Sequence, residues 1–472
     1  MDDDLCFTQA VDLARMLRSR ELSARELLDA ILHRIHRVNP QLNAIVSLAE
    51  PQALECAAAA DEAAARGAVL GPLHGLPIAV KDLADTAGIR TTYGSPLFAD
   101  YIPDADAPHV ALLRAAGAVI VGKTNTPEFG VGSQTVNPVF GGTRNPYDVR
   151  MTCGGSSGGA AAAVAAGLLP VADGSDLAAS VRNPAAMCGV VGLRTTPGLI
   201  PAVHPAKDDV FDPQAVIGPI ARSAADAALL LAGLRGCDQA LPLARPGRDT
   251  GAGSGFQVPE LAGLRLAWSA DLGGLPVEPE VAETLDRARR AIAGGGAAIA
   301  DAEPDLSDAD EIFHVLRALM LAGKLGTLLQ TGRDRMKETL VWNIEQGLAL
   351  TGPQVADALR RRSQVFARMK EFLRRFDVLA LPTVQVTPFP VELEWVTEIN
   401  GVPQRTYLEW MRSCSRITVT AHPAVSVPAG FSADGLPVGL QLVGRYGADQ
   451  RLLAIAEAVS RVTVSAPARP PI

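Results

Sequence analysis

The chain has 472 residues, of which 48% are hydrophobic and 20% are charged. This composition is typical of a globular protein and excludes a disordered or fibrous one. The formal net charge at pH 7 is −8, so neither nucleic acid nor an anionic membrane has an electrostatic reason to bind. We therefore expect neither as a partner, and we expect a monomer or a homodimer.

The cysteines predict the compartment and exclude a metal site. They are scattered, with no CxxC pair and no histidine at metal-binding spacing: Cys6, Cys56, Cys153, Cys188, Cys237 and Cys414. This pattern is typical of reduced thiols in a cytosolic protein, not of a disulfide framework or a zinc site. The first residues, MDDDLC, are acidic, whereas a secretory signal begins with a positively charged region. We expect a cytoplasmic protein without a metal ion.

The first part of the chain predicts helices, and strands follow. Ser23 and Glu26 have the spacing of a capping box, and apolar residues then recur at helical spacing. The segments LPIAVKDLADTAG (76–88) and AVIVGKTNTPEFG (118–130) each run from a β-rich stretch into a polar turn. Strands that alternate with helical patterns predict a largely parallel α/β sheet. The most apolar stretch, residues 158–172, is too short to span a bilayer and is expected to be a buried helix.

Late strands complete this sheet. They are DVLALPTV (377–384), HPAVSVPAGF (422–431) and GLPVGLQLVG (435–444), and their nearest available partners are the early strands. We therefore predict a single domain over residues 1–472. It would comprise N-terminal helices over about 1–65, a core over about 66–236 completed by 376–472, and a variable helical segment over about 260–375.

The stretch CGGSSGGAAAAVAAG (153–167) places two serines between two glycine pairs. It lacks the lysine of a P-loop, and Cys153 stands where a dinucleotide fingerprint has its first glycine. It does match the GxSxG elbow of α/β-hydrolases, in which a serine attacks and a later histidine takes its proton. The histidines available for that role are His204, His314 and His422, and none has a context that singles it out.

Two further residues change the interpretation. Ser180 follows a polar turn, and Lys81 ends the apolar strand LPIAVKD, where burial can keep a lysine neutral. The ordinary alternative is a surface lysine, whose methylene groups lie along apolar surface while its ammonium is exposed to water. Together, Lys81, the glycine block with Ser156, and Ser180 in SDLAASVRNPAAMCGVVGL resemble the amidase signature family. Ser180 follows Ser156 by 24 residues, as in that family, and NTPEFG, NPVFGGTRNPYD and the late strands resemble other family segments.

The resemblance implies a fold and a catalytic triad. The fold is an α/β domain with a mixed, mostly parallel twisted sheet covered by α-helices, and no cofactor is implied. Ser180 would attack the carbonyl carbon, Ser156 after a cis peptide bond would relay the proton, and neutral Lys81 would be the base.

The resemblance also implies binding and supporting roles. The oxyanion hole would consist of the main-chain N–H groups of Leu177, Ala178, Ala179 and Ser180. The main chain near Gly130 would line the other side of the substrate, and Ser157, Asp176 and Arg182 would support the loop. The family usually has Gly-Gly where Ala178-Ala179 stands here, and alanine keeps the N–H donors but resists a positive φ and adds methyl groups. We therefore expect an altered pocket width and the same reaction.

The predicted function is a serine hydrolase that cleaves C–N bonds of small amides through an acyl-enzyme. Aryl or alkyl amides, carbamates and esters are the candidate substrates. Apolar residues at helical spacing in 307–330 favour a core-facing helix over a lid around an apolar substrate. The first alternative is the glutamine-hydrolysing subunit of a tRNA-dependent amidotransferase, although this chain has RNPA at 182–185 where such subunits tend to have RQPA. The second is a protein that only binds amides.

Overall fold

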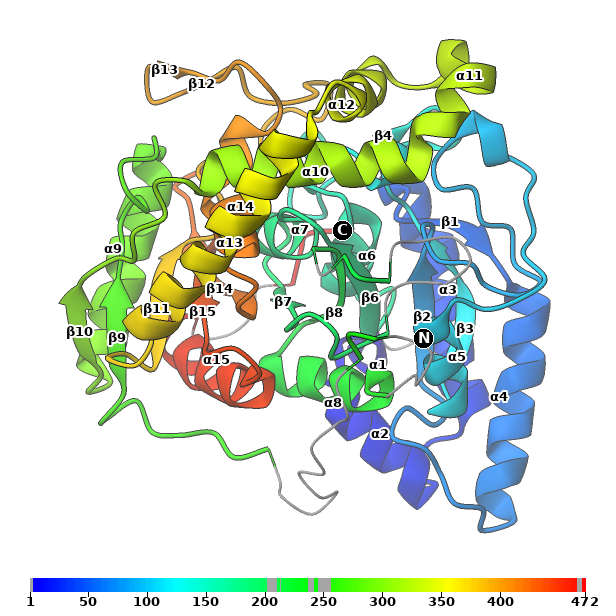
Figure 1. Cartoon of the computed structure of the whole chain (residues 1–472). Coiled ribbons are helices and arrows are strands. Elements are labelled where there is room, and N and C mark those ends of the chain that lie inside the picture. Colours follow the sequence, from blue (N-terminus) through cyan, green and yellow to red (C-terminus); the bar gives the residue numbers. More distant parts are fainter. Residues whose placement is uncertain (1–2, 202–209, 213, 237–241, 245–255, 465–468) are drawn as a thin grey trace.

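The central element of the fold is an eight-stranded sheet (Figure 1), seen in a computed structural model that describes residues 3–201, 210–212, 214–236, 242–244, 256–464 and 469–472. The strand order is β10-β9-β11-β15-β14-β7-β8-β6. The strands are β6 (Val171–Asp176), β7 (Val191–Arg194), β8 (Val216–Ala221), β9 (Arg265–Trp268), β10 (Ala298–Asp301), β11 (Val378–Pro382), β14 (Ala424–Phe431) and β15 (Pro437–Val443). Of the predicted late strands, β14 pairs with β7 and β11 pairs with β9. The early strands that the sequence named, within 76–88 and 118–130, do not pair with them, because they lie in a second sheet.

Both strand directions occur in this sheet. Neighbours run parallel in β10-β9-β11 and antiparallel from β11 through β15, β14, β7 and β8 to β6. The α/β class and the mixed sheet are confirmed. Antiparallel neighbours are more numerous than the strand–helix alternation predicts, because β14 and β15 form a direct hairpin and β8 lies between β6 and β7.

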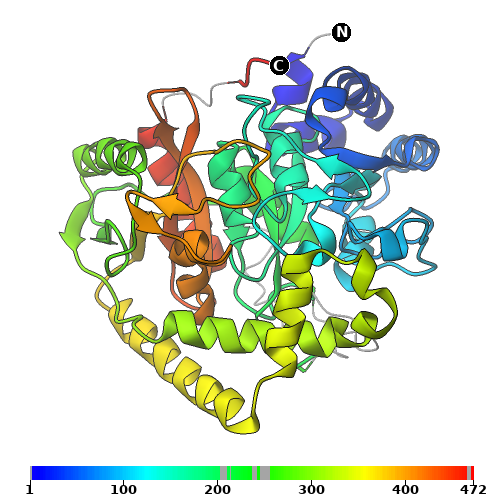
Figure 2. The ribbon, with the colours of Figure 1, turned by 90° about the horizontal axis from the view of Figure 1, so that it is seen from above.

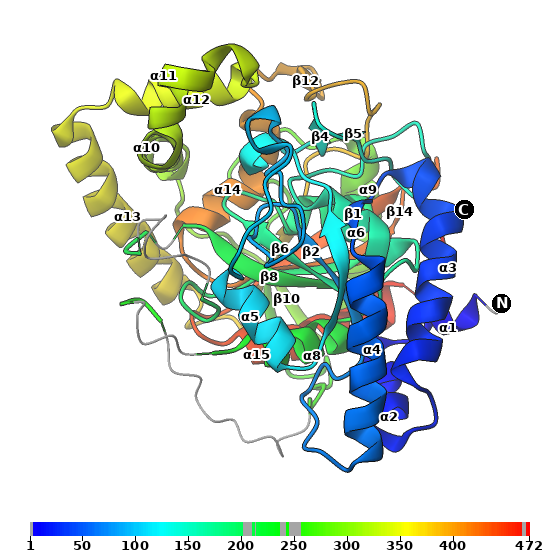
Figure 3. The ribbon, with the colours of Figure 1, turned by 90° about the vertical axis from the view of Figure 1, so that its right-hand side faces the viewer.

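A second sheet, of order β1-β3-β2, lies beside the first. Its strands are β1 (Ile45–Leu48), β2 (Pro77–Lys81) and β3 (Val119–Thr124). β2 pairs with β3 in parallel. β2 also packs against β6 of the first sheet, and Figures 1 and 3 show β2 and β6 side by side. All five residues of β2 are buried, which places Lys81 inside the protein.

Of the four N-terminal helices (blue in Figure 3), the last two pack on the second sheet. The four helices are α1 (Asp4–Phe7), α2 (Ala10–Ser19), α3 (Ala24–Leu42) and α4 (Glu50–Ala65). The predicted capping box of α3 is confirmed, with Glu26 N–H donating to Ser23 Oγ at 3.1 Å and Ser23 N–H to Glu26 Oε2 at 2.9 Å. The sequence prediction missed β1, which lies between α3 and α4.

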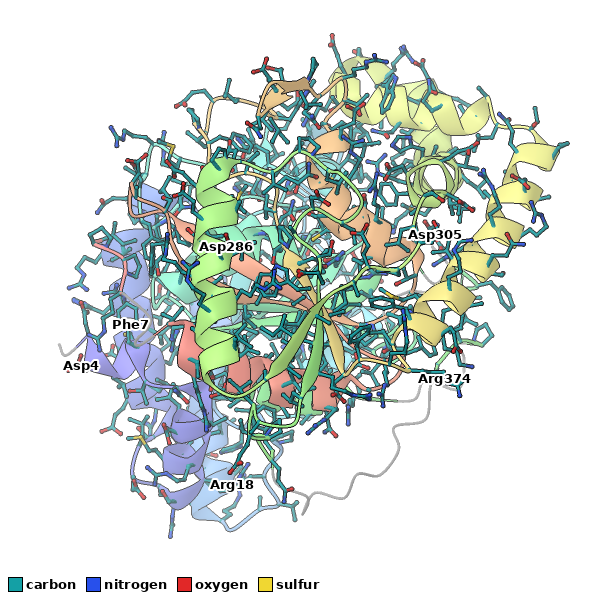
Figure 4. The ribbon with its side chains drawn as sticks, turned by 90° about the vertical axis from the view of Figure 1, so that its left-hand side faces the viewer. Asp4, Phe7, Arg18, Asp286, Asp305 and Arg374 are labelled. Atoms are coloured by element: carbon teal, nitrogen blue, oxygen red, sulfur yellow. The ribbon has the colours of Figure 1, made fainter. Side chains whose placement is uncertain are left out.

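The remaining core helices pack on the sheets. They are α5 (Pro108–Ala115), α6 (Gly158–Ala165), α7 (Arg182–Met187), α8 (Ala224–Leu234), α9 (Pro279–Gly294) and α15 (Asp449–Thr463). Every residue of α6 is buried, as expected, but the helix predicted over 158–172 ends at Ala165, and Val171 and Ala172 begin β6. Figure 4 shows α9 at the front, carrying Asp286, over the part of the sheet formed by the late strands, and α9 and α15 both contact β14.

A group of helices far from both termini completes the fold (Figure 2). They are α10 (Ala309–Leu325), α11 (Leu329–Gly332), α12 (Glu338–Leu348), α13 (Gly352–Phe372) and α14 (Arg412–Val419). The segment predicted as helical over 260–375 is not helical throughout, because it begins with β9 and β10 of the central sheet. The stretch Ala309–Arg335 is long and apolar enough to cross a membrane by length and composition, but Ile312, Phe313 and Leu316 are buried in the protein core.

Short elements form the turns and loops between these helices and strands. The short strands are β4 (Val136–Asn137), β5 (Gly141–Gly142), β12 (Glu398–Ile399) and β13 (Val402–Pro403). The 3₁₀ turns are η1 (Pro96–Phe98), η2 (Glu128–Gly130), η3 (Gly326–Leu328), η4 (Arg333–Arg335) and η5 (Glu409–Met411).

Candidate active site

Lys81 ends β2 in a cluster of serine hydroxyls. Its side chain is buried, and Nζ donates to Ser156 Oγ and Ser157 Oγ at 2.8 Å each and to Ser175 Oγ at 3.1 Å. Burial lowers the pKa of Lys81, the carboxylates of Asp173 and Asp176 act in the opposite direction, and the resulting pKa is about 7. A large share of Lys81 is therefore neutral near pH 7 and can accept a proton.

The glycines of the 153–159 loop are required by close contacts. The Gly155–Ser156 peptide bond is cis, as the resemblance implies. A Cβ at Gly155 would lie 2.9 Å from Gln134 N, and one at Gly158 would lie 2.3 Å from Thr135 Oγ1. Thr135 Oγ1 in turn donates to Gly154 O at 2.8 Å. These glycines let the loop pack against residues 133–135, and that packing places Ser156 over Lys81.

Ser180 lies in the turn between β6 and α7, next to the loop of Ser156. Ser157 N–H donates to Ser180 O at 2.9 Å, which holds the two serine loops together. Within the described part of the chain, no hydrogen bond involves the Ser180 hydroxyl, and the residue is 8% exposed. Its oxygen is therefore not committed to a structural contact.

The main chain around Ser180 offers unused donors. Among the described residues, none accepts a hydrogen bond from the N–H groups of Leu177, Ala178, Ala179 or Ser180. Neither Ala178 nor Ala179 is among the described residues with a positive φ, so this loop does not need the glycines usual in the family. Free main-chain N–H donors beside a serine are suited to form an oxyanion hole.

A buried ion network fixes the loop. Asp176 ends β6 and accepts two bonds from Arg182, from Nε and Nη2, at 3.0 Å each. Arg194 also donates to Asp176, while Arg182 Nη2 donates to Ala178 O at 2.7 Å. Burial alone would raise the pKa of Asp176, but the two guanidinium groups outweigh it and lower the pKa to about 2. Asp176 and Arg182 thus fix the main chain of residues 177–180, which carries the free N–H donors.

Gly130 lies on the other side of Ser156. Its φ is +72°, and a Cβ there would lie 2.7 Å from Leu83 Cδ1 and 3.5 Å from Ser156 Oγ. The structure therefore places Ser156, Ser157 and Gly130 around Lys81 and holds the Ser180 turn beside the loop of Ser157. Glycine is needed at position 130 both for the backbone conformation and for space.

The histidines of the elbow interpretation lie elsewhere. His422 is buried with Nδ1 2.8 Å from Thr420 O, and its ring packs against Phe366. His314 lies on α10, and His204 lies outside the described residues. Within the part of the chain that the structure describes, the Ser156 and Ser157 hydroxyls are bonded to Lys81 Nζ and to no histidine. This geometry favours the lysine triad over the elbow.

Sequence reasoning missed two acidic residues at the site. Asp173 Oδ1 accepts the Lys81 N–H at 2.9 Å, and Glu128, buried beside Gly130, accepts from Ser95 Oγ at 2.6 Å. The signal for Asp173 was a carboxylate directly after the apolar stretch that ends at Ala172. Glu128 had no signal, because its partners are distant in the chain.

The helix α10 faces the core, as expected. Ile312, Phe313 and Leu316 are buried in the same hydrophobic cluster as Ala178 and Ala179. A cavity of about 670 Å³ lies farther out, between α11 and α12, and no residue of the triad lines it. Its lining residues are Leu329, Gln330, Thr331, Gly332, Arg333, Asp334, Met336, Glu338, Val341, Trp342 and Glu345. No group of three or more potential metal ligands occurs in the described ranges.

Comparison with known proteins gives a consistent result. Residues 26–453 match the family model described as Amidase. The chain is 37% identical over 458 residues to an acylamidase of Rhodococcus erythropolis, covering 96% of this chain and 95% of that protein. It is 35% identical over 494 residues to a glutamyl-tRNA(Gln) amidotransferase subunit of Moorella thermoacetica, covering 98% and 97%.

Solved structures agree over nearly the whole chain. A bacterial aryl acylamidase of the amidase signature enzymes has a TM-score of 0.88 at 28% identity, covering 97% of this chain and 96% of that one. The 6-aminohexanoate cyclic dimer hydrolase has a TM-score of 0.87 at 29% identity, covering 99% of both chains. The chain is an amidohydrolase of the amidase signature family.

Proposed function

We propose that the chain hydrolyses small amides through an acyl-enzyme on Ser180. The observation that carries this proposal is the 2.8 Å hydrogen bond between buried Lys81 Nζ and Ser156 Oγ, beside the unused N–H donors of the Ser180 turn. Buried lysines with a lowered pKa are suited to act as bases at neutral pH.

The reaction follows from these positions. Ser180 Oγ attacks the carbonyl carbon, its proton passes to Ser156 Oγ, and the Ser156 proton passes to Lys81 Nζ. The oxyanion that forms accepts hydrogen bonds from N–H groups of residues 177–180, and loss of one such donor typically costs roughly 10²–10³ in rate. The proton returns through Ser156 to the leaving nitrogen as the C–N bond breaks. Water then attacks the acyl-enzyme and passes its proton through Ser156 to Lys81. This proton returns through Ser156 to Ser180 Oγ as the acid leaves, which restores the free enzyme.

The surroundings support substrates with an apolar acyl or amine group. Ala178, Ala179 and Val131 belong to the hydrophobic cluster that includes the buried face of α10. Aryl or alkyl amides fit such surroundings best, and carbamates and esters form the same tetrahedral intermediate. The similarity to an acylamidase and to an aryl acylamidase supports this choice.

A second candidate is glutamine hydrolysis within a tRNA-dependent amidotransferase. It is supported by similarity to such a subunit at 35% identity over 98% of the chain. The alanines at 178 and 179 and Asn183 in RNPA speak against it, because such subunits typically have glycines and glutamine there. In this case the purified chain would release ammonia from glutamine or bind partner subunits.

One screen tests both candidates. The purified chain is assayed against an aryl amide, an alkyl amide, a carbamate, an ester and glutamine, with Ser180→Ala as the matched inactive control. We expect turnover of the aryl or alkyl amide, lost in the control, and little release of ammonia from glutamine. Turnover of glutamine alone would select the amidotransferase candidate, and turnover that survives Ser180→Ala would exclude both.

A further inference from the structure

Two buried side chains connect the turn of Ser180 to the loop of Ser156. Asn183, in the first turn of α7, donates from Nδ2 to Ser133 Oγ at 3.1 Å. Ser133 Oγ in turn donates at 2.9 Å to the main-chain oxygen of Gly155, the residue directly before Ser156. Asn183 and Ser133 are both buried. The catalytic steps above use neither side chain.

The direction of these two hydrogen bonds follows from the needs of the Gly155 oxygen. Within the described ranges, this buried carbonyl accepts from no donor other than Ser133, and a buried carbonyl without a donor is costly. A serine hydroxyl has a single hydrogen, so the Ser133 oxygen can only accept from Asn183. The amide of Asn183 is therefore required as a donor, and its NH₂ group faces Ser133.

The other end of this link is fixed to the nucleophile turn. Asn183 N–H donates at 2.8 Å to the oxygen of Ala179, the residue directly before Ser180. On the far side of Ser156, Ser157 N–H donates to Ser180 O at 2.9 Å. The main chain of Ser156 is thus tied to the Ser180 turn both before and after the serine.

We propose that Ser133 and Asn183 are positioning residues that hold Ser156 between Ser180 and Lys81. This inference rests on the function proposed above. A relay hydroxyl must lie within hydrogen-bond reach of both the nucleophile and the base, so a small displacement of its main chain costs one of the two contacts. Lys81 Nζ contacts Ser156 Oγ at 2.8 Å, and the link through Ser133 sets where Ser156 lies relative to Ser180.

The test is the rate at which a fluorophosphonate labels Ser180, together with kcat and KM for an aryl amide. Ser133→Ala removes the donor to Gly155 O, and Asn183→Leu removes the donor to Ser133 at similar side-chain volume. Each change should lower kcat and the labelling rate about 10- to 100-fold and change KM by less than about twofold. Ser133→Thr keeps the hydroxyl and should restore both rates. Asn183→Ala replaces Asn183→Leu if that variant does not fold.

Thr143, directly after β5, provides a matched control. Its Oγ1 also accepts from an asparagine, Asn125 Nδ2 at 3.0 Å, and also donates to a main-chain oxygen, Asn43 O at 2.7 Å. Thr143→Val should therefore lose about as much stability as Ser133→Ala and keep the wild-type kcat and labelling rate. Equal kinetic losses in Thr143→Val and Ser133→Ala would overturn the proposal, because loosened packing alone would then explain them.

A double variant shows whether the effect passes through Ser156. Ser156→Ala already lacks the relay hydroxyl, so adding Ser133→Ala should slow labelling by less than about twofold, whereas a further loss of about tenfold would overturn the proposal. Hydrolysis that survives Ser180→Ala would refute the proposed function itself. If Ser180→Ala is inactive but Ser133→Ala and Asn183→Leu keep the wild-type kcat, this inference fails and the proposed function stands.

Discussion

Lys81 acquires its chemistry from burial. An ammonium at the end of a fully buried strand loses its solvation, which lowers its pKa, and only the carboxylates of Asp173 and Asp176 act in the other direction. The serine hydroxyls around Nζ can either accept from the ammonium or donate to the neutral amine. Such a group can change its charge during turnover without losing its hydrogen bonds.

The first prediction concerns the acid limb of activity. Because the pKa of Lys81 is about 7, kcat/KM for an uncharged amide should fall about tenfold per pH unit below pH 7 and level off above it. Lys81→Met should lose most of the activity together with the limb. A pH series on both proteins checks this. A limb near neutrality that survives in Lys81→Met would assign the base to another residue.

The second prediction concerns stability in acid. The pKa of Asp176 is lowered in the folded state to about 2, so its contribution to stability is fully present above the unfolded value of about 3.8. That contribution is lost as the pH falls from about 4 through 2. Asp176→Asn should be less stable than the wild type at pH 5, and the difference should shrink towards pH 2. Urea unfolding at several pH values measures it; a constant difference would contradict the assignment.

At the scale of elements, Glu128 connects the loop of Gly130 to the helices around α10. Its carboxylate accepts from Ser95 Oγ at 2.6 Å and from the main-chain N–H of Lys337, just before α12, at 2.8 Å. Lys337 Nζ also lies 3.6 Å from where a Cβ on Gly132 would be. The start of α12 is therefore fixed to the loop that borders Ser156.

The third prediction follows from this link. Glu128→Ala leaves two buried donors without an acceptor and should destabilise the chain by about 1–3 kcal/mol, with an increase in KM. The control is Glu394→Gln, which weakens the more exposed pair between Glu394 and Lys337 and should cost less than about 1 kcal/mol. Unfolding curves and KM values are measured for both variants. If both variants lose the same stability and raise KM equally, Glu128 does not have the linking role described here.

Element types were predictable wherever local pattern and tertiary pairing agreed. The β-rich runs at 76–81, 118–124 and 435–444 are strands because branched apolar residues suit a buried sheet. β1 and β9 were missed, since each has four residues, and the sequence of β9, RLAW, suits a helix as well. Their strand form comes from pairing with distant neighbours, which a local pattern does not contain.

The residues of the site also divide into those that the sequence predicts and those that it does not. The motif residues Lys81, Ser156 and Ser180 are predicted from the resemblance to the amidase signature family, and the structure places Lys81 Nζ 2.8 Å from Ser156 Oγ. The contact between His109 and Asp173 was not predictable, because the two residues are distant in sequence and meet only in the folded chain.

The whole molecule is organised by one sheet that joins the strands around the Ser180 turn to the late strands β11, β14 and β15. β6, which leads into the Ser180 turn, and β9, which begins the segment 260–375, are strands of the same eight-stranded sheet. The variable helices are therefore attached to the core through β9, β10 and β11. From this connection we expect the single domain that the sequence predicts.

The fourth prediction tests this cooperativity. All four tryptophans lie between residues 268 and 410: Trp268, Trp342, Trp395 and Trp410. Tryptophan fluorescence thus reports on β9, on α12 and on residues 395–410, which contact α12 through Tyr407, whereas loss of fluorophosphonate labelling reports on the Ser180 turn. In urea both signals should change at the same midpoint, as in a two-state transition. Separate midpoints would divide the chain into two folding units.

The central claim is that Ser180 attacks and Ser156 only relays its proton to Lys81. Labelling with a fluorophosphonate followed by peptide mapping by mass spectrometry tests it most directly, because the reagent bonds to the activated serine. The adduct should lie on Ser180, disappear in Ser180→Ala, and form more slowly but still on Ser180 in Ser156→Ala. His314→Ala and His422→Ala should keep the same labelled residue. An adduct on Ser156 or Ser157 in the intact enzyme would contradict the account.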